Sequence, residues 1–75
     1  MHERYRVVAE VSGGGGAGEN VLWEGTLAEL RATYGDDPEA DPIQSSEVAG
    51  HLTVRKVVRR ETPDGWEECA DPRRS

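Results

Sequence analysis

Apolar and polar residues alternate along residues 5–12 (YRVVAEVS). A period of two is typical of a strand that buries one of its faces. The pattern therefore predicts a strand here. Its core face would carry Tyr5, Val7, Ala9 and Val11.

A longer alternating segment, residues 51–60 (HLTVRKVVRR), is followed by Thr62-Pro63-Asp64-Gly65 and by the short segment 66–69 (WEEC). Proline at the second position and glycine at the last are typical of a tight turn between strands. The pattern predicts a hairpin with one long and one short strand. One face of the long strand would carry Leu52, Val54, Lys56 and Val58, and the other Thr53, Arg55, Val57 and Arg59.

The glycine-rich segment 13–19 (GGGGAGE) separates the first strand from a short predicted strand, residues 20–24 (NVLWE). Glycine has no side chain to pack and is costly to order, so we expect a flexible hairpin loop. Gly13, Gly15 and Gly18 match the G-x-G-x-x-G spacing of dinucleotide-binding domains. That motif requires a helix after the last glycine, and the strand that follows argues against phosphate binding. In this strand Val21 and Trp23 should share a face.

Residues 26–34 (TLAELRATY) have the pattern of a short helix. Thr26 and Glu29 form a capping box, in which each side chain accepts a hydrogen bond from the backbone N–H of the other residue. Gly35 is placed to end the helix. The apolar stripe would be Leu27, Leu30 and Tyr34.

The remaining segments are less regular. Residues 36–42 (DDPEADP) should form a charged loop, and the polar tail, residues 70–75, should fray. In residues 43–50 (IQSSEVAG), the preceding aspartate and proline favour a short helical turn. The chain is thus predicted to be one α+β domain, residues 1–75, with a small antiparallel sheet in the order β-β-α-β-β and one short helix packed on one face.

The acidic net charge of the chain argues against two classes of partner. The net charge is −6 and the pI is about 4.8, which argues against direct nucleic-acid binding and against an anionic membrane as partner. No apolar run is long enough for a spanning helix. The single cysteine permits no internal disulfide, which is typical of a reducing compartment, and we expect a cytoplasmic protein.

No group of residues has the spacing that catalysis or metal binding requires. Cys69 follows two glutamates, which should raise its pKa and lower its reactivity. His2, His51 and Cys69 are scattered and lack the spacing of a zinc site. A chain of 75 residues also has little room for a water-excluding cleft. We therefore expect no enzymatic activity, no metal and no cofactor.

Two groups of charged residues are candidates for contact with a partner. The basic run in residues 55–60 could pair with Glu10, Glu67 and Glu68 across the sheet, or could form a contact patch. The candidate contact residues are Arg55, Val57 and Arg59 in this run, and the acidic residues Glu29, Asp36, Asp37 and Glu39.

Three functions fit these features. The first is a small acidic protein-interaction module that binds a macromolecular partner through its open sheet face or an edge strand. The second is an acidic, phage-type inhibitor that imitates nucleic acid and blocks a nucleic-acid-binding enzyme of the host. The third is a small ligand-binding or enzymatic subunit of a homo-oligomer, for instance a homodimer.

Overall fold

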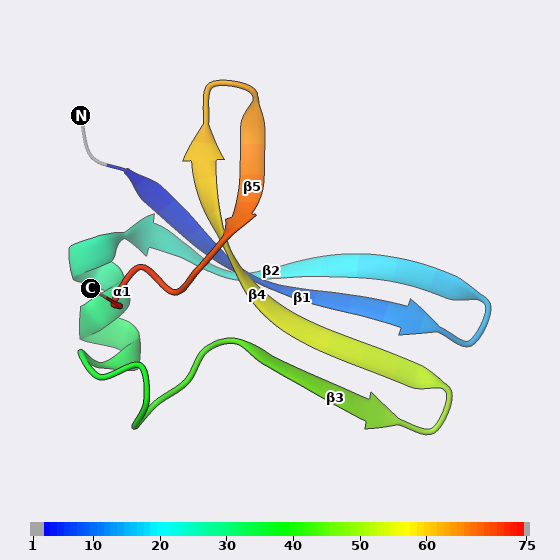
Figure 1. The fold of residues 1–75 in the computed structure, drawn as a ribbon. Coiled ribbons are helices and arrows are strands. Elements are labelled where there is room, and N and C mark those ends of the chain that lie inside the picture. The colour runs from blue at the N-terminus through cyan, green and yellow to red at the C-terminus, as the bar shows by residue number, and fades with distance from the viewer. Residues whose placement is uncertain (1–2, 75) are drawn as a thin grey trace.

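The computed structural model describes residues 3–74 as a five-stranded antiparallel sheet with one short helix (Figure 1). This confirms the predicted α+β class. In chain order the elements are β1 (Arg4–Gly13), β2 (Gly16–Thr26), α1 (Leu27–Tyr34), β3 (Ser45–Ala49), β4 (Leu52–Thr62) and β5 (Gly65–Cys69).

The sheet is organised around β4. Its neighbours give the order β2-β1-β4-β3, and β5 also pairs with β4. On the edge opposite β1, β3 pairs with residues 52–56 of β4 and β5 pairs with residues 58–62. The two short strands therefore lie end to end, and the Gln44 side chain donates a 3.0 Å hydrogen bond to the Cys69 carbonyl where they meet.

Strand β3 is a correction to the sequence analysis, because residues 43–50 were predicted to form a helical turn. Ile43 is buried in the core at 1% exposure, whereas Val48 is 74% exposed. The two side chains therefore occupy different environments, and their spacing of five residues follows neither the helical nor the strand period. Gly50, with φ 62°, begins a two-residue turn into β4, and pairing with β4 overrides the local capping signal.

The glycine-rich segment is a tight turn rather than a seven-residue loop. Only Gly14 and Gly15, with φ of 60° and 89°, lie between β1 and β2. Two adjacent residues with positive φ are typical of the turn that best joins twisted antiparallel strands.

A β-bulge lies in the middle of β2. Val7 faces Trp23, but Val8 faces Val21, so β2 contains one extra residue, Leu22. The prediction that Val21 and Trp23 share a face is therefore wrong, because the bulge reverses the alternation between them. Trp23 packs against the core and contacts Tyr34 edge to face at 6.1 Å between ring centroids, whereas Val21 is 53% exposed.

Helix α1 has the predicted capping box. The Thr26 hydroxyl accepts a hydrogen bond from the Glu29 N–H at 3.3 Å, and the Glu29 carboxylate accepts one from the Thr26 N–H at 2.9 Å. Leu30 is fully buried on the sheet. It belongs to a small core with Tyr5, Val7, Ile43 and Val58.

The C-terminal segment, residues 70–74, is anchored, although residues 70–75 were predicted to fray; Ser75 lies outside the described residues. The Arg73 side chain is fully buried, and its guanidinium pairs with the Asp71 carboxylate at 2.8 Å. The same guanidinium donates hydrogen bonds to the carbonyls of Tyr34, Gly35 and Asp41. Arg73 thus joins the end of α1, the following loop and the C-terminal segment, whose path beside α1 is visible in Figure 1.

This buried pair predicts a pH dependence of stability. The hydrogen bonds from Arg73 hold the pKa of the Asp71 carboxyl below its usual range. A depressed pKa stabilises the fold fully above the unfolded value of about 3.9, and the stabilisation is lost as pH falls through the folded value. We expect Asp71→Asn to be less stable than the wild type at neutral pH and the difference to shrink below about pH 4.

Urea denaturation at a series of pH values measures this difference. Glu24→Gln is the control, because Glu24 also pairs with arginines but is exposed, and its difference from the wild type should stay small throughout. A difference in stability between Asp71→Asn and the wild type that does not change with pH would show that the pKa of Asp71 is not lowered by folding.

Candidate interaction surface

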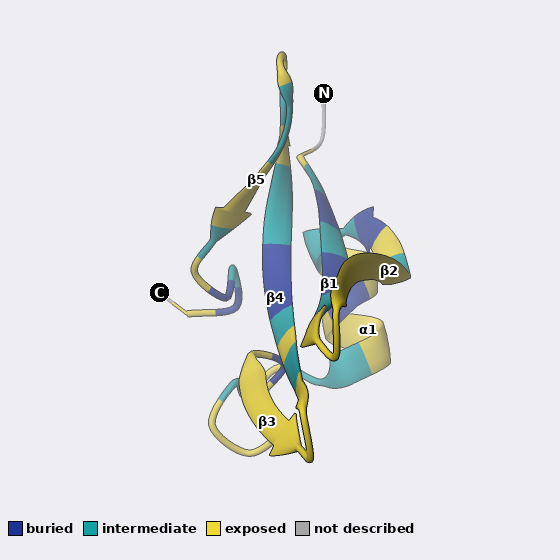
Figure 2. Cartoon of the chain, turned by 90° about the vertical axis from the view of Figure 1, so that its right-hand side faces the viewer, coloured by how far each residue is buried: buried dark blue, intermediate teal, exposed yellow. Residues whose placement is uncertain are grey.

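The helix covers only one part of the sheet. We call the strand segments beyond the bulge the distal half: residues 8–13, 16–22, 45–49 and 52–57. In Figure 1 the β1–β2 and β3–β4 hairpins project away from α1, and Figure 2 shows β3 and most of β2 exposed. The distal half contains all the exposed large hydrophobic side chains of residues 3–74, namely Val21, Leu22, Val48 and Leu52.

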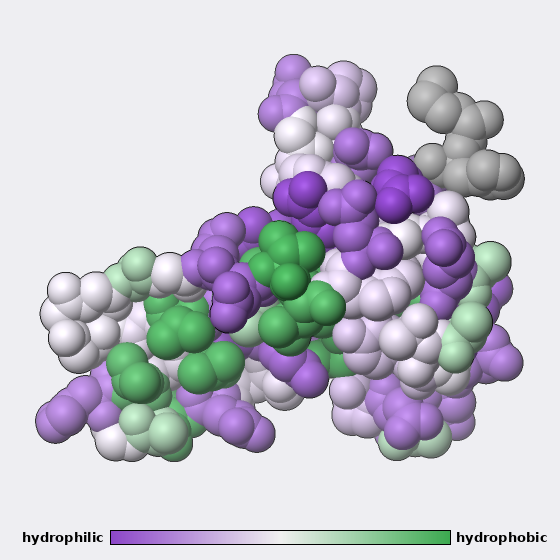
Figure 3. Space-filling model, turned by 180° about the vertical axis from the view of Figure 1, so that it is seen from behind, coloured by the Kyte–Doolittle hydropathy of each residue, from purple (hydrophilic) through white to green (hydrophobic). Residues whose placement is uncertain are grey.

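One face of the distal half is the continuation of the core face. Strand pairing places Val11 beside Val54, Ala9 beside Lys56, and Leu52 beside Ala49 on this side. Leu52 is 43% exposed, and no helix lies over these residues. We call this surface the bare face, and define it by Ala9, Val11, Ala49, Leu52 and Val54, with Glu47 and Lys56 among them. In Figure 3 hydrophobic side chains gather on the projecting hairpins and in the middle of the molecule.

The opposite face carries a network of ion pairs, which we call the charged face. Arg59 contacts Glu10 at 2.6 Å and Glu19 at 2.7 Å. Arg55 contacts Glu10 at 3.4 Å and Glu68 at 2.9 Å. The predicted pairing of the basic run with Glu10 and Glu68 is thus confirmed, whereas Glu19 is a partner that the sequence analysis missed.

The ion pairs flank two buried valines. Val8 and Val57 face each other at 1% and 2% exposure, between the Arg6–Arg59 row and the Glu10–Arg55 row. Long charged side chains can cover such positions with their aliphatic stems while their charged ends stay in water. Val57 therefore offers almost no surface to a partner. Of the other two predicted contact residues, Arg59 is held by Glu10 and Glu19, whereas Arg55 pairs with Glu10 and Glu68 but keeps 47% of its side chain exposed.

Trp66 completes the charged face next to Arg6. Its ring lies 4.0 Å from the Arg6 guanidinium carbon, a cation–π contact, and the side chain is only partly buried. Arg6 also pairs with Glu24 at 2.8 Å. Trp66 is thus a cover over the sheet rather than a member of the core.

We therefore expect Trp66→Ala to lower the free energy of unfolding by about 1–2 kcal/mol, less than the ~3–5 kcal/mol typical of a core tryptophan. Urea denaturation measures this. Trp23→Ala is the matched control, because Trp23 packs against the core, and it should cost more. Equal losses for the two variants would show that Trp66 is a core residue.

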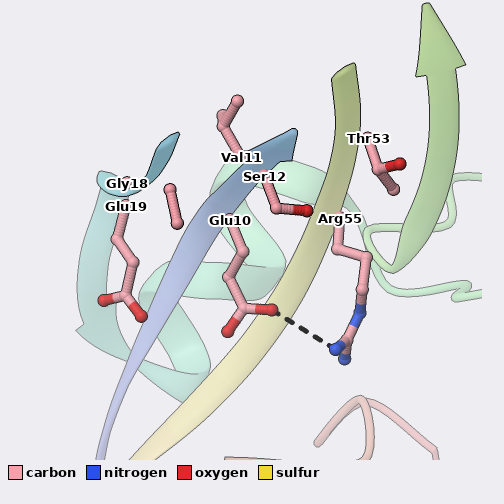
Figure 4. A pocket seen from close by; sticks show the side chains of 8 residues that line it. Glu10, Val11, Ser12, Gly18, Glu19, Thr53 and Arg55 are labelled. Atoms are coloured by element: carbon pink, nitrogen blue, oxygen red, sulfur yellow. Dashed lines mark ion pairs between the residues drawn. The ribbon is translucent and has the colours of Figure 1, made fainter. Parts of the chain in front are cut away.

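A shallow groove follows the ion pairs toward the hairpin tips. It holds about 380 Å³, and Figure 4 shows the side chains that line it, with the Glu10–Arg55 ion pair among them. Ser12 lies between Ala17 and Thr53 in register, so small side chains leave a hollow beside the longer charged ones. The two carboxylates of the groove, Glu10 and Glu19, are paired with arginines. The hydroxyls of Ser12 and Thr53 have no histidine beside them in the groove lining that could act as a base.

The acidic candidates do not form one site. Glu29 caps the first turn of α1, whereas Asp36 follows the end of that helix. A helix of eight residues is about 12 Å long, so the two carboxylates lie at opposite ends of α1. Asp37 accepts a hydrogen bond from the Glu39 N–H, and Asp36 and Glu39 approach Arg31 and Arg74 at 4.0 and 3.9 Å. The structure therefore gathers Asp36, Asp37 and Glu39 in one exposed loop and separates Glu29 from them.

The residues that were considered for catalysis and metal binding, Cys69 and the two histidines, do not form a metal site in the described part of the chain. Burial raises the pKa of the Cys69 thiol, and Asp71, Glu3 and Glu67 act in the same direction against Arg60. Within residues 3–74 there is no cluster of three or more His, Cys, Asp or Glu side chains suited to a metal ion. Of the described residues, none belongs to a helix long and apolar enough to span a bilayer. His2 lies outside the described residues.

Comparisons of the chain with protein-family models, with curated proteins and with solved structures find no match.

Proposed function

We propose that this protein is a small non-catalytic interaction module that binds a macromolecular partner through the distal half of its sheet. The observation that carries the proposal is the position of the exposed hydrophobic side chains. All four large ones among residues 3–74 lie in the distal half, on strand segments beyond the part of the sheet that α1 covers. These side chains lie on both faces of the sheet, and apolar surface left in water on uncovered strand segments is available to a binding partner.

The edge of β3 supports the same function. Edge strands are usually protected by lysine, proline or a bulge. The other edge, β2, contains the bulge at Leu22, whereas β3 (SSEVA) contains none of these devices and all five of its residues are exposed. An extended segment of a partner could add to β3 by main-chain hydrogen bonds, with Val48 as an apolar contact.

The nucleic-acid mimic receives less support. Imitation of a phosphate backbone requires unpaired negative charge spread over a surface. Most carboxylates on the sheet are neutralised by arginines, and the exposed acids at residues 36, 37 and 39 are confined to one loop.

Affinity capture from the native host with quantitative mass spectrometry tests the proposal. The baits are the wild type, Val48→Asp and Leu52→Asp, each of which places a charge in the distal half. Ala32→Asp is the control, since it adds the same charge to the exposed side of α1. We expect a partner protein that the wild type and Ala32→Asp capture and that at least one distal variant loses. Equal capture by all four baits, or no enrichment over a charge-matched protein, would overturn the proposal.

A further inference from the structure

The chain has more surface than a compact monomer of its size. Its accessible surface is 5105 Å², whereas a folded chain of 8.2 kDa is expected to have about 4,500 Å². Its radius of gyration is 13.2 Å, against about 11 Å for a compact domain of this length. The excess, roughly 600 Å², is close to the ~800 Å² that each partner buries in a standard interface.

The bare face has the composition of an interface between two sheets. Val11 and Val54 are paired at its middle, and Ala9, Ala49 and glycines at residues 13, 16 and 18 surround them. Small side chains allow a second sheet to approach to the usual distance of ~10 Å. The charged face, with its long side chains and its groove, lies on the other side.

The bare face carries one positive and one negative side chain, so it is complementary in charge to the same face of a second copy. Lys56 and Glu47 lie diagonally across β4 and β3, with Val54 adjacent to both. Among residues 3–74, neither has an ion-pair partner, although most other charged side chains of the sheet do. A two-fold axis passing between them would bring each ammonium group to the carboxylate of the other copy, which is the reciprocal contact of an isologous interface.

We propose that the bare face is the interface of a two-fold symmetric dimer of this chain, with Val11, Val54 and Leu52 packed across the axis and Lys56 paired with Glu47 of the second copy. The inference rests on the proposed function, since it assigns an occupant to one face of the distal half. The edge of β3 and the charged face remain free for a different partner.

Sedimentation equilibrium of the full chain, from about 1 µM to about 1 mM, tests the dimer. We expect the wild type to dimerise within this range. Leu52→Asp should weaken dimerisation at least ~10-fold, because it places a charge in the apolar contact. Val48→Asp is the matched control: Val48 belongs to the same hairpin and is more exposed, but it faces the other side of the sheet, so its dimer should be unchanged.

A charge exchange gives a second, independent readout. Lys56→Glu and Glu47→Lys should each weaken the dimer, and the double variant should restore it. A wild type that stays monomeric at about 1 mM, equal weakening by Leu52→Asp and Val48→Asp, or a double variant weaker than both singles would overturn the dimer. A monomeric chain that still captures another protein overturns this inference alone. A dimer that captures nothing else overturns the proposed function and leaves the inference standing.

Discussion

Replacement of Arg73 by alanine is expected to lower the free energy of unfolding by about 3–5 kcal/mol. Removal of the guanidinium leaves the buried Asp71 carboxylate without its cation and three backbone carbonyls without their donor. A domain of this length should have a total stability of roughly 4–11 kcal/mol, so the variant should be largely unfolded or close to it.

The neighbouring arginine provides the control for this experiment. Arg74 has the same charge, but its side chain is 56% exposed and its nearest carboxylate lies at 3.9 Å. We expect Arg74→Ala to stay within about 0.5 kcal/mol of the wild type in urea denaturation. A loss of less than about 1 kcal/mol for Arg73→Ala would show that the C-terminal segment does not hold the fold together.

Gly13→Ala should be the second most damaging substitution, at about 3 kcal/mol or more. Gly13 has φ +109°, which an L side chain rarely adopts, and a Cβ there would lie 1.9 Å from the His51 carbonyl oxygen. Backbone strain alone costs about 1–3 kcal/mol, and removal of the clash requires the tips of the two hairpins to separate.

Gly16, which faces Gly13 in the same hairpin, distinguishes the clash at Gly13 from a general effect of alanine on stability. Gly16 has no neighbouring atom within 4 Å of a built Cβ and no positive φ, so Gly16→Ala should be nearly neutral in thermal or urea denaturation. Similar losses for the two variants would contradict the close approach of Gly13 to His51.

The parts of the fold that could be predicted are those determined by residues close together in the sequence. The capping box of Thr26 and Glu29 and the Pro63-Asp64 turn are local signals, and the structure contains both elements. The anchored C-terminal segment had no such signal, because the three carbonyls that Arg73 binds belong to residues 32–39 positions away in the chain. Strand β3 was missed for a related reason, since its pairing with β4 outweighs the local preference for a turn.

The sequence indicated which residues share a face of the candidate surface, but not which of them would be exposed. The two faces of the long strand were assigned correctly, but the extent to which the helix covers one of them was not predicted. An eight-residue helix is about 12 Å long, whereas the 11 residues of β4 extend about 37 Å. These lengths alone indicate that much of the core face lies beyond the helix. Burial of Val57 was not predictable in the same way, because it depends on Arg59 reaching Glu19 across three strands.

The core, anchored by Arg73, holds one half of the molecule together, and we propose that the uncovered distal half serves for association. Amide hydrogen exchange, measured at low and high protein concentration, tests this most directly. At low concentration the amides around Val7, Leu30 and Val58 should exchange only through global unfolding, whereas the distal amides of β3 and β4 should exchange through much cheaper local opening. Raising the concentration should slow exchange in the distal strands, which the dimer covers, and should also slow the core amides, because dimerisation stabilises the folded chain against global unfolding. Equal protection of both halves at low concentration, unchanged at high concentration, would show that the two halves unfold as one unit and that the distal half does not associate.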